Sequence, residues 1–92
     1  MMAQLSLEYI ANDNRVSCIV NETYEERNHA SRKYNINSNW DNFLRMRRIR
    51  NFLDRHEGQT VDFETSSPYA NSLDQKFEEI KRLVDYHNRR LG

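Results

Sequence analysis

The chain has little of several residues and features on which other classes of protein depend. It has one cysteine, Cys18, so no disulfide can form within it. One proline and two glycines exclude a low-complexity chain rich in those residues. No segment approaches the roughly 18 apolar residues of a membrane span. The opening MMAQLSLEYIAN carries no basic leader before an apolar stretch. We therefore expect an intracellular, reducing environment with Cys18 as a buried free thiol.

A catalytic or metal-binding motif is also missing. The three histidines, His29, His56 and His87, are far apart and have no cysteine or carboxylate at metal-ligand spacing. Asp62 and Glu64 alternate as nuclease metal ligands can, but no lysine follows them. We expect no enzymatic activity, metal or cofactor.

What remains is enough for one small folded domain over residues 1–92. Hydrophobic residues make up 37% of the chain and charged residues 30%. The apolar residues are patterned, which favours a folded domain with a modest core over a disordered chain.

The first third of the sequence predicts strands. Apolar and polar residues alternate on both sides of Asn12-Asp13-Asn14, which predicts a hairpin because Asn and Asp tolerate left-handed backbone angles. Its apolar positions are Leu5, Leu7, Tyr9, Val16, Cys18 and Val20. KYNIN (33–37) and QTVDFET (59–65) predict two further short strands.

Two segments predict helices. In SNWDNFLRMRRIRNFLDRHEG (38–58), Ser38 or Asn39 can cap the start and Gly58 can end the helix. A second helix is expected from Ser72, with Gln75 completing a capping box. Its apolar positions are Leu73, Phe77, Ile80, Val84 and Leu91, with His87 in the same row.

The predicted order is β-β-β-α-β-α. It indicates an α+β domain with a small antiparallel sheet of three to four strands and two amphipathic helices. The second helix is expected to pack on the sheet. A homodimer joined through that helix is a less favoured alternative.

The first helix places its apolar residues on one side. With about 100° per residue and Trp40 at zero, the core arc runs from about 120° to 240°. It contains Met46, Ile49, Phe52, Leu53 and His56, with Phe43 at its edge. Arg45 and Arg50 are expected on the two borders, with their charged ends in water.

The opposite side of this helix predicts a contact surface. It carries Trp40, Leu44, Arg47, Arg48, Asn51 and Arg55, and Arg32 and Lys33 could extend it from the preceding strand. Trp and Arg dominate binding hot spots, so this mixture is typical of an interface. Two simpler interpretations stay open: the arginines are a solvated surface, or Trp40 folds back onto the protein.

Charge is segregated along the chain although its formal net charge is zero. Residues 27–56 hold eight basic and two acidic residues, whereas residues 1–26 hold one basic and five acidic residues. Eleven of the fourteen basic residues are arginine, which suits two-pronged contacts to phosphate or carboxylate. The neutral total argues against a protein that coats nucleic acid generally.

Two segments characterise the chain as a whole: the opening hairpin QLSLEYIANDNRVSCIV and the helix NWDNFLRMRRIRNFLDRHEG. In size, α+β class and lack of enzymatic motifs it resembles the small phage-encoded anti-CRISPR proteins that act on type I surveillance complexes. These inhibitors share no common sequence motif, so the resemblance transfers no residue by position.

The resemblance implies a non-enzymatic inhibitor in the cytoplasm of a bacterial host. Such a protein binds the Cas subunits of the guide-RNA-loaded complex, with crRNA or the path of the target DNA as further contacts. It then blocks recruitment of target DNA. Two alternatives remain from the residues themselves: a small regulator that binds nucleic acid directly and, less favoured, a toxin-like ribonuclease that uses His56.

Overall fold

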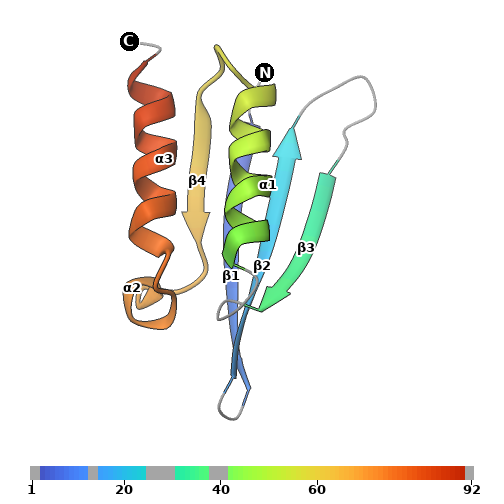
Figure 1. The fold of residues 1–92 in the computed structure, drawn as a ribbon, viewed down its shortest axis with the longest axis vertical. Coiled ribbons are helices and arrows are strands. Elements are labelled where there is room, and N and C mark those ends of the chain that lie inside the picture. The colour runs from blue at the N-terminus through green and yellow to red at the C-terminus, as the bar shows by residue number, and fades with distance from the viewer. Residues whose placement is uncertain (1–2, 13–14, 25–30, 38–41, 91–92) are drawn as a thin grey trace.

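A computed structural model describes residues 3–12, 15–24, 31–37 and 42–90, with backbone only for residues 11, 12, 15, 24 and 31–37. The elements are β1 (Ala3–Asn12), β2 (Arg15–Tyr24), β3 (Ser31–Asn37), α1 (Asn42–Arg55), β4 (Val61–Thr65), α2 (Ala70–Leu73) and α3 (Phe77–Arg89). Figure 1 shows α1 and α3 side by side in front of the sheet. The α+β class, the four strands and the two long helices are as predicted.

The sheet has the order β3-β2-β1-β4. The pairs β1–β2 and β2–β3 are antiparallel, as expected, and Leu7 lies opposite Val20 in the first of them. β4 is parallel to β1, with Ala3 opposite Val61, so the expectation of an all-antiparallel sheet is wrong at this edge. The reason is the crossover: α1 carries the chain back along the sheet, so β4 runs in the same direction as β1.

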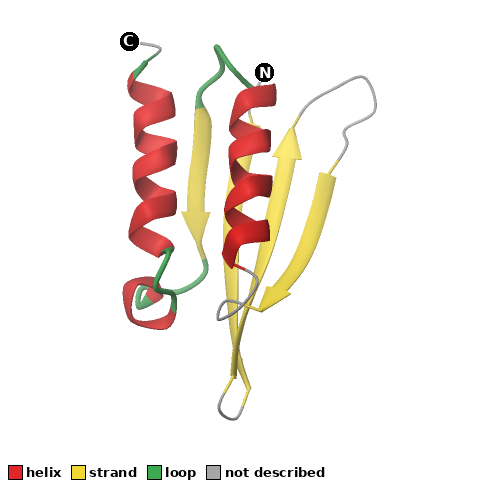
Figure 2. Ribbon diagram, viewed as in Figure 1, coloured by secondary structure: helices red, strands yellow, loops and turns green. Residues whose placement is uncertain are grey.

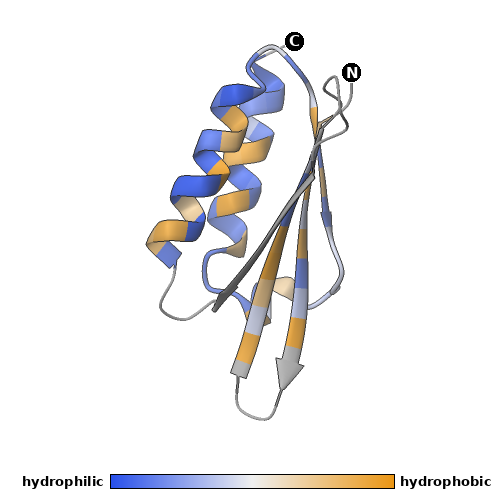
Figure 3. Cartoon of the chain, turned by 90° about the vertical axis from the view of Figure 1, so that its right-hand side faces the viewer, coloured by the Kyte–Doolittle hydropathy of each residue, from blue (hydrophilic) through white to orange (hydrophobic). Residues whose placement is uncertain are grey.

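The helices form one layer and the strands the other, as Figures 2 and 3 show. Period-two alternation turns one side of each strand toward the helices. The core between the layers contains Ala3, Leu5, Leu7, Cys18, Val20, Met46, Ile49, Phe52, Leu53, Val61, Phe77, Ile80 and Val84. Every residue predicted for the apolar arc of α1 except Phe43 is therefore buried, His56 included.

The second predicted helix is interrupted near its start. The chain forms the short α2, becomes extended at Asp74, and begins α3 only at Phe77. The predicted capping box of Ser72 and Gln75 is therefore wrong. Asp74 Oδ1 instead accepts the backbone N–H of Lys76, the residue that precedes α3, at 2.9 Å.

The predicted ends of α1 are only partly within the described residues. Gly58 has φ of +86°, the left-handed conformation expected of a glycine that follows a helix. Ser38, Asn39, Trp40, the Asp13-Asn14 pair, His29 and Leu91 lie outside the described residues. No helix in the described ranges is long and apolar enough to cross a membrane.

Candidate interaction surface

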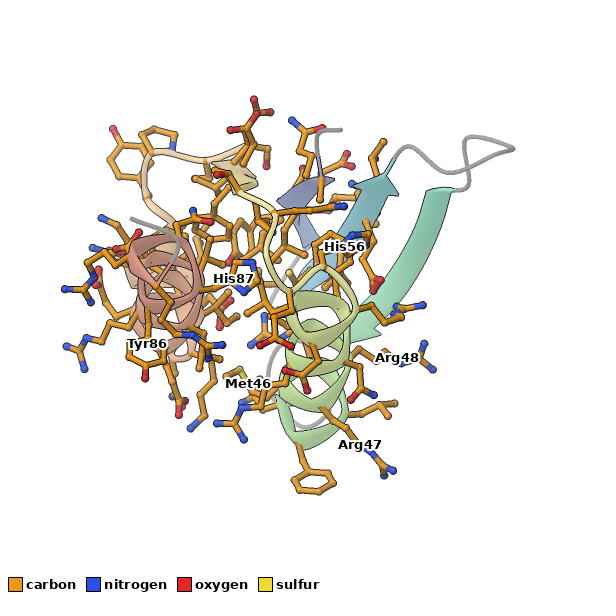
Figure 4. All side chains as sticks on the ribbon, turned by 90° about the horizontal axis from the view of Figure 1, so that it is seen from above. Met46, Arg47, Arg48, His56, Tyr86 and His87 are labelled. Carbon is orange, nitrogen blue, oxygen red and sulfur yellow. The ribbon has the colours of Figure 1, made fainter. Side chains whose placement is uncertain are left out.

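The outer face of α1, defined here by Phe43, Leu44, Arg47 and Asn51, is exposed. Phe43 is 80% exposed and Leu44 is 44% exposed. Arg47 and Asn51 are exposed beside them, and Figure 4 shows Arg47 extending from α1 away from α3. Two apolar side chains therefore stand next to a guanidinium on the side of the helix that faces away from the sheet.

Phe43 was expected at the edge of the core, and that expectation is wrong. α1 begins at Asn42, so Phe43 lies in its first turn. On the wheel it is about 60° beyond the last buried position, which directs it outward. Beneath this turn lies a polar cluster around Arg45.

Arg45 was expected on the border with its charged end in water, and this too is wrong. Its side chain is 0% exposed, and its Nη1 lies 2.6 Å from Oδ2 of the equally buried Asp74. The signal in the sequence was its wheel angle of about 140°, which lies inside the core arc. Sequence reasoning missed this residue because it gave more weight to the charge than to the angle.

The Arg45–Asp74 pair is held by a hydrogen-bonded cluster. Arg45 Nη2 donates to Asp74 Oδ1 at 2.8 Å and to Asn42 Oδ1 at 2.7 Å. The Tyr9 hydroxyl donates to Asp74 Oδ2 at 2.7 Å. The cluster joins β1, α1 and the α2–α3 junction, so it determines how the first turn of α1 sits on the sheet.

Burial and hydrogen bonding act in opposite directions on the pKa of Asp74. Burial raises that pKa, but hydrogen bonds from Arg45 and Tyr9 outweigh burial and hold it below its ordinary value. Burial, followed by the bond to Asp74, raises the pKa of Tyr9 far above its usual range. Burial also raises the pKa of the Cys18 thiol, which the nearby Arg45 only partly offsets. At neutral pH the cluster is an ion pair between neutral neighbours.

A second buried carboxylate, Glu22, lies on β2 beneath the other end of α1. Its side chain is 1% exposed, and its Oε2 is 3.4 Å from Nη2 of the 44%-exposed Arg55. Arg55, predicted as a partner-binding residue, therefore also serves as the counter-charge of a buried acid. Arg48 is half-buried, whereas Arg47 forms no ion pair within the described residues.

Arg32 and Lys33 were expected to extend the arginine surface, and both lie on β3. The register pairs Arg32 with Glu22 and Lys33 with Asn21. Adjacent strand positions alternate between the two faces of a sheet, so these two positions cannot both lie on the face that α1 covers.

The face of the sheet that no helix covers is chemically different from α1. Its described side chains are Gln4, Ser6, Glu8, Ile10, Ser17, Ile19, Asn21, Thr23, Asp62 and Glu64. Among them are three acids and neither a base nor an aromatic ring on which a nucleobase could stack. Among the described side chains, three acids therefore lie on this face, whereas Arg47, Arg48, Arg50 and Arg55 lie on α1.

Two of the histidines, His56 and His87, contact the same residue, Gln59. His87 Nε2 donates to the backbone carbonyl of Gln59 at 2.8 Å, and His56 Nδ1 lies 3.2 Å from Gln59 Oε1. Both rings are buried, and the ring of His56 lies 4.6 Å from that of Phe52. Within the described residues, no three His, Cys, Asp or Glu side chains are grouped to hold a metal ion.

Comparison with known proteins adds no relative. No family model matches the chain, and neither a curated protein nor a solved structure matches it significantly.

Proposed function

We propose that this protein is a non-enzymatic inhibitor that docks through the outer face of α1 onto a guide-RNA-loaded CRISPR surveillance complex and blocks recruitment of target DNA. One observation carries the proposal. Phe43, Leu44 and Arg47 are exposed together, and Arg47 has no ion pair within the described residues. Phe and Arg are both enriched in protein interfaces, so Phe43 beside an available guanidinium has the composition of a binding surface.

The charge distribution supports a selective partner over free nucleic acid. A guanidinium can form two-pronged hydrogen bonds with RNA phosphates and with protein carboxylates. The acids of the uncovered sheet face repel phosphate, however, and the net charge of zero supplies no general attraction. A complex of protein and RNA can contact both kinds of side chain on this surface: its protein can cover the apolar residues, and its phosphates or carboxylates can bind the arginine.

The specific partner is proposed from the resemblance in type to anti-CRISPR inhibitors. The Arg45–Asp74 pair anchors the first turn of α1, which carries Phe43 and Leu44. Such an inhibitor would act in the cytoplasm of the bacterial host, where these complexes work. The described residues offer no observation that favours a ribonuclease, since His56 is buried.

The test uses reconstituted, crRNA-loaded type I complexes. A native gel shift measures how far the protein inhibits their binding of target DNA. The double variant Leu44→Ala with Arg47→Glu should raise the half-inhibitory concentration at least about tenfold, because each hot-spot loss costs about 1 kcal/mol or more. Arg82→Glu on α3 is the matched control: it is exposed and changes the net charge by the same amount. It should inhibit as the unmodified protein does.

Three outcomes decide the matter. Equal inhibition by the double variant and the control would mean that the outer face of α1 is not the docking site. DNA binding that persists in every complex tested would refute the inhibitory function. Tight binding of naked DNA or RNA that weakens steeply between two salt concentrations would instead indicate a direct nucleic-acid-binding regulator.

A further inference from the structure

A groove of about 210 Å³ separates α1 from α3 on the side away from the sheet. It is distinct from the outer face of α1 used in the proposed function. Its lining includes Arg50, Leu53, Asp54, Leu83, Tyr86 and Arg90. Figure 4 shows Met46 between the two helices and Tyr86 at the outer side of α3.

The groove is lined by the aliphatic side chains of Leu53 and Leu83, the buried imidazole of His87 and the exposed ring of Tyr86. Leu53 belongs to the core, and Leu83 packs against that core while remaining partly accessible. Tyr86 is 59% exposed, and the guanidinium of Arg90 lies 5.7 Å from the centre of its ring. An aliphatic side chain placed here would remove apolar surface of Leu83 and Tyr86 from water.

The lining of the groove carries two arginines, Arg50 and Arg90, and one carboxylate, Asp54. Arg50 has no ion pair within the described residues, and Arg90 is held by Glu57 at 3.1 Å in a solvent-exposed pair that is weak. Arg89 lines an adjoining hollow together with Tyr86 and Arg90. Asp54 is the only carboxylate in the lining, and it can accept the N–H groups of a ligand backbone.

We infer that this groove binds an acidic peptide segment of a partner protein, with one aliphatic side chain inside it and flanking carboxylates on Arg50 and Arg90. Charge complementarity with Arg50 and Arg90 selects the carboxylates, and Leu53 and Leu83 suit an aliphatic side chain, which a peptide has and RNA lacks. The volume is below the roughly 300 to 1,000 Å³ of most small-ligand sites, so it suits a single side chain. This inference goes beyond the proposed function, because it concerns another surface and another class of ligand.

The probe is the peptide EELEE, blocked at both ends, added to isotope-labelled protein and followed by two-dimensional NMR. Saturable shifts are expected at Leu53, Leu83 and Tyr86 with peptide at about millimolar concentration. Two control peptides should each bind at least about fivefold more weakly. QQLQQ lacks the carboxylates that pair with the arginines, and EEGEE lacks the leucine side chain that fills the groove. Binding at unrelated residues, or equal binding of all three peptides, would overturn the inference.

Two surface variants test the groove itself. Arg50→Gln and Tyr86→Ala should each weaken EELEE at least about fivefold, the effect of losing one charge-assisted hydrogen bond or one aromatic contact. Arg82→Gln and Tyr69→Ala are the matched controls, since both residues are exposed and lie outside the groove. Equal weakening by a variant and its control would overturn the inference.

A pentauridylate probe separates RNA from peptide. RNA that displaces EELEE from the groove would overturn the inference in favour of a nucleic-acid site. The proposed function is decided separately, because its variant changes Leu44 and Arg47, which do not line the groove.

Discussion

Removing the buried guanidinium of Arg45 should destabilise the protein far more than removing an exposed one. Arg45→Met keeps the length of the side chain but deletes both bonds to Asp74 and the bond to Asn42. Among the described residues, the Tyr9 hydroxyl and the Lys76 N–H then remain as donors to the buried Asp74. Breaking a buried pair in this way costs about 3 to 5 kcal/mol. A 92-residue domain has a total stability of about 5 to 14 kcal/mol.

The effect should depend on pH in a defined direction. In the unmodified protein the pKa of Asp74 lies below its ordinary value of about 3.9, so the contribution of the pair to stability is complete above that value. This contribution to stability is lost as the pH falls through the pKa that Asp74 has in the folded protein. In Arg45→Met, burial without the guanidinium raises the pKa of Asp74, and protonation then relieves the unpaired charge. The difference in stability between the two proteins should therefore narrow from pH 7 to pH 3.

Urea unfolding followed by circular dichroism measures both effects, with trimethylamine N-oxide added if Arg45→Met does not fold by itself. Arg50→Met is the control on the same helix and should change stability by no more than about 0.5 kcal/mol. Adding Asp74→Asn to Arg45→Met should recover at least about 1 kcal/mol, because it removes the unpaired charge. Equal losses for Arg45→Met and Arg50→Met, or a difference that does not change with pH, would refute this account.

Two further predictions concern the core. Ile80→Ala should lower the free energy of unfolding by about 2 to 5 kcal/mol, because Ile80 is fully buried between α3 and the sheet. The exposed Arg82→Ala should change it by less than about 0.5 kcal/mol, and similar values from urea titrations would show that α3 does not pack as described. Cys18 is buried and burial raises its thiol pKa, so native protein at pH 8 should react with iodoacetamide much more slowly than protein in urea. Equal labelling rates, measured by mass spectrometry, would contradict its burial.

The parts of the fold that depend on neighbouring residues were predictable from the sequence. Alternation between apolar and polar residues identified the β1–β2 hairpin, because side chains of a strand point alternately to its two faces. The apolar arc identified the buried side of α1, and Gly58 marked the end of that segment. The outward position of Leu44 followed from the same wheel.

Contacts between distant residues decided the rest. Only the tertiary structure shows that Arg45 is buried, because its partner Asp74 lies 29 residues further along the chain. The interruption between α2 and α3 falls at Asp74, and the apolar spacing of that segment does not reveal it. The parallel pairing of β4 with β1 and the groove between α1 and α3 likewise arise from how the elements pack. A sequence pattern reports which side of an element is apolar, but a charged residue can occupy that side when packing brings it a counter-charge and hydrogen-bond partners.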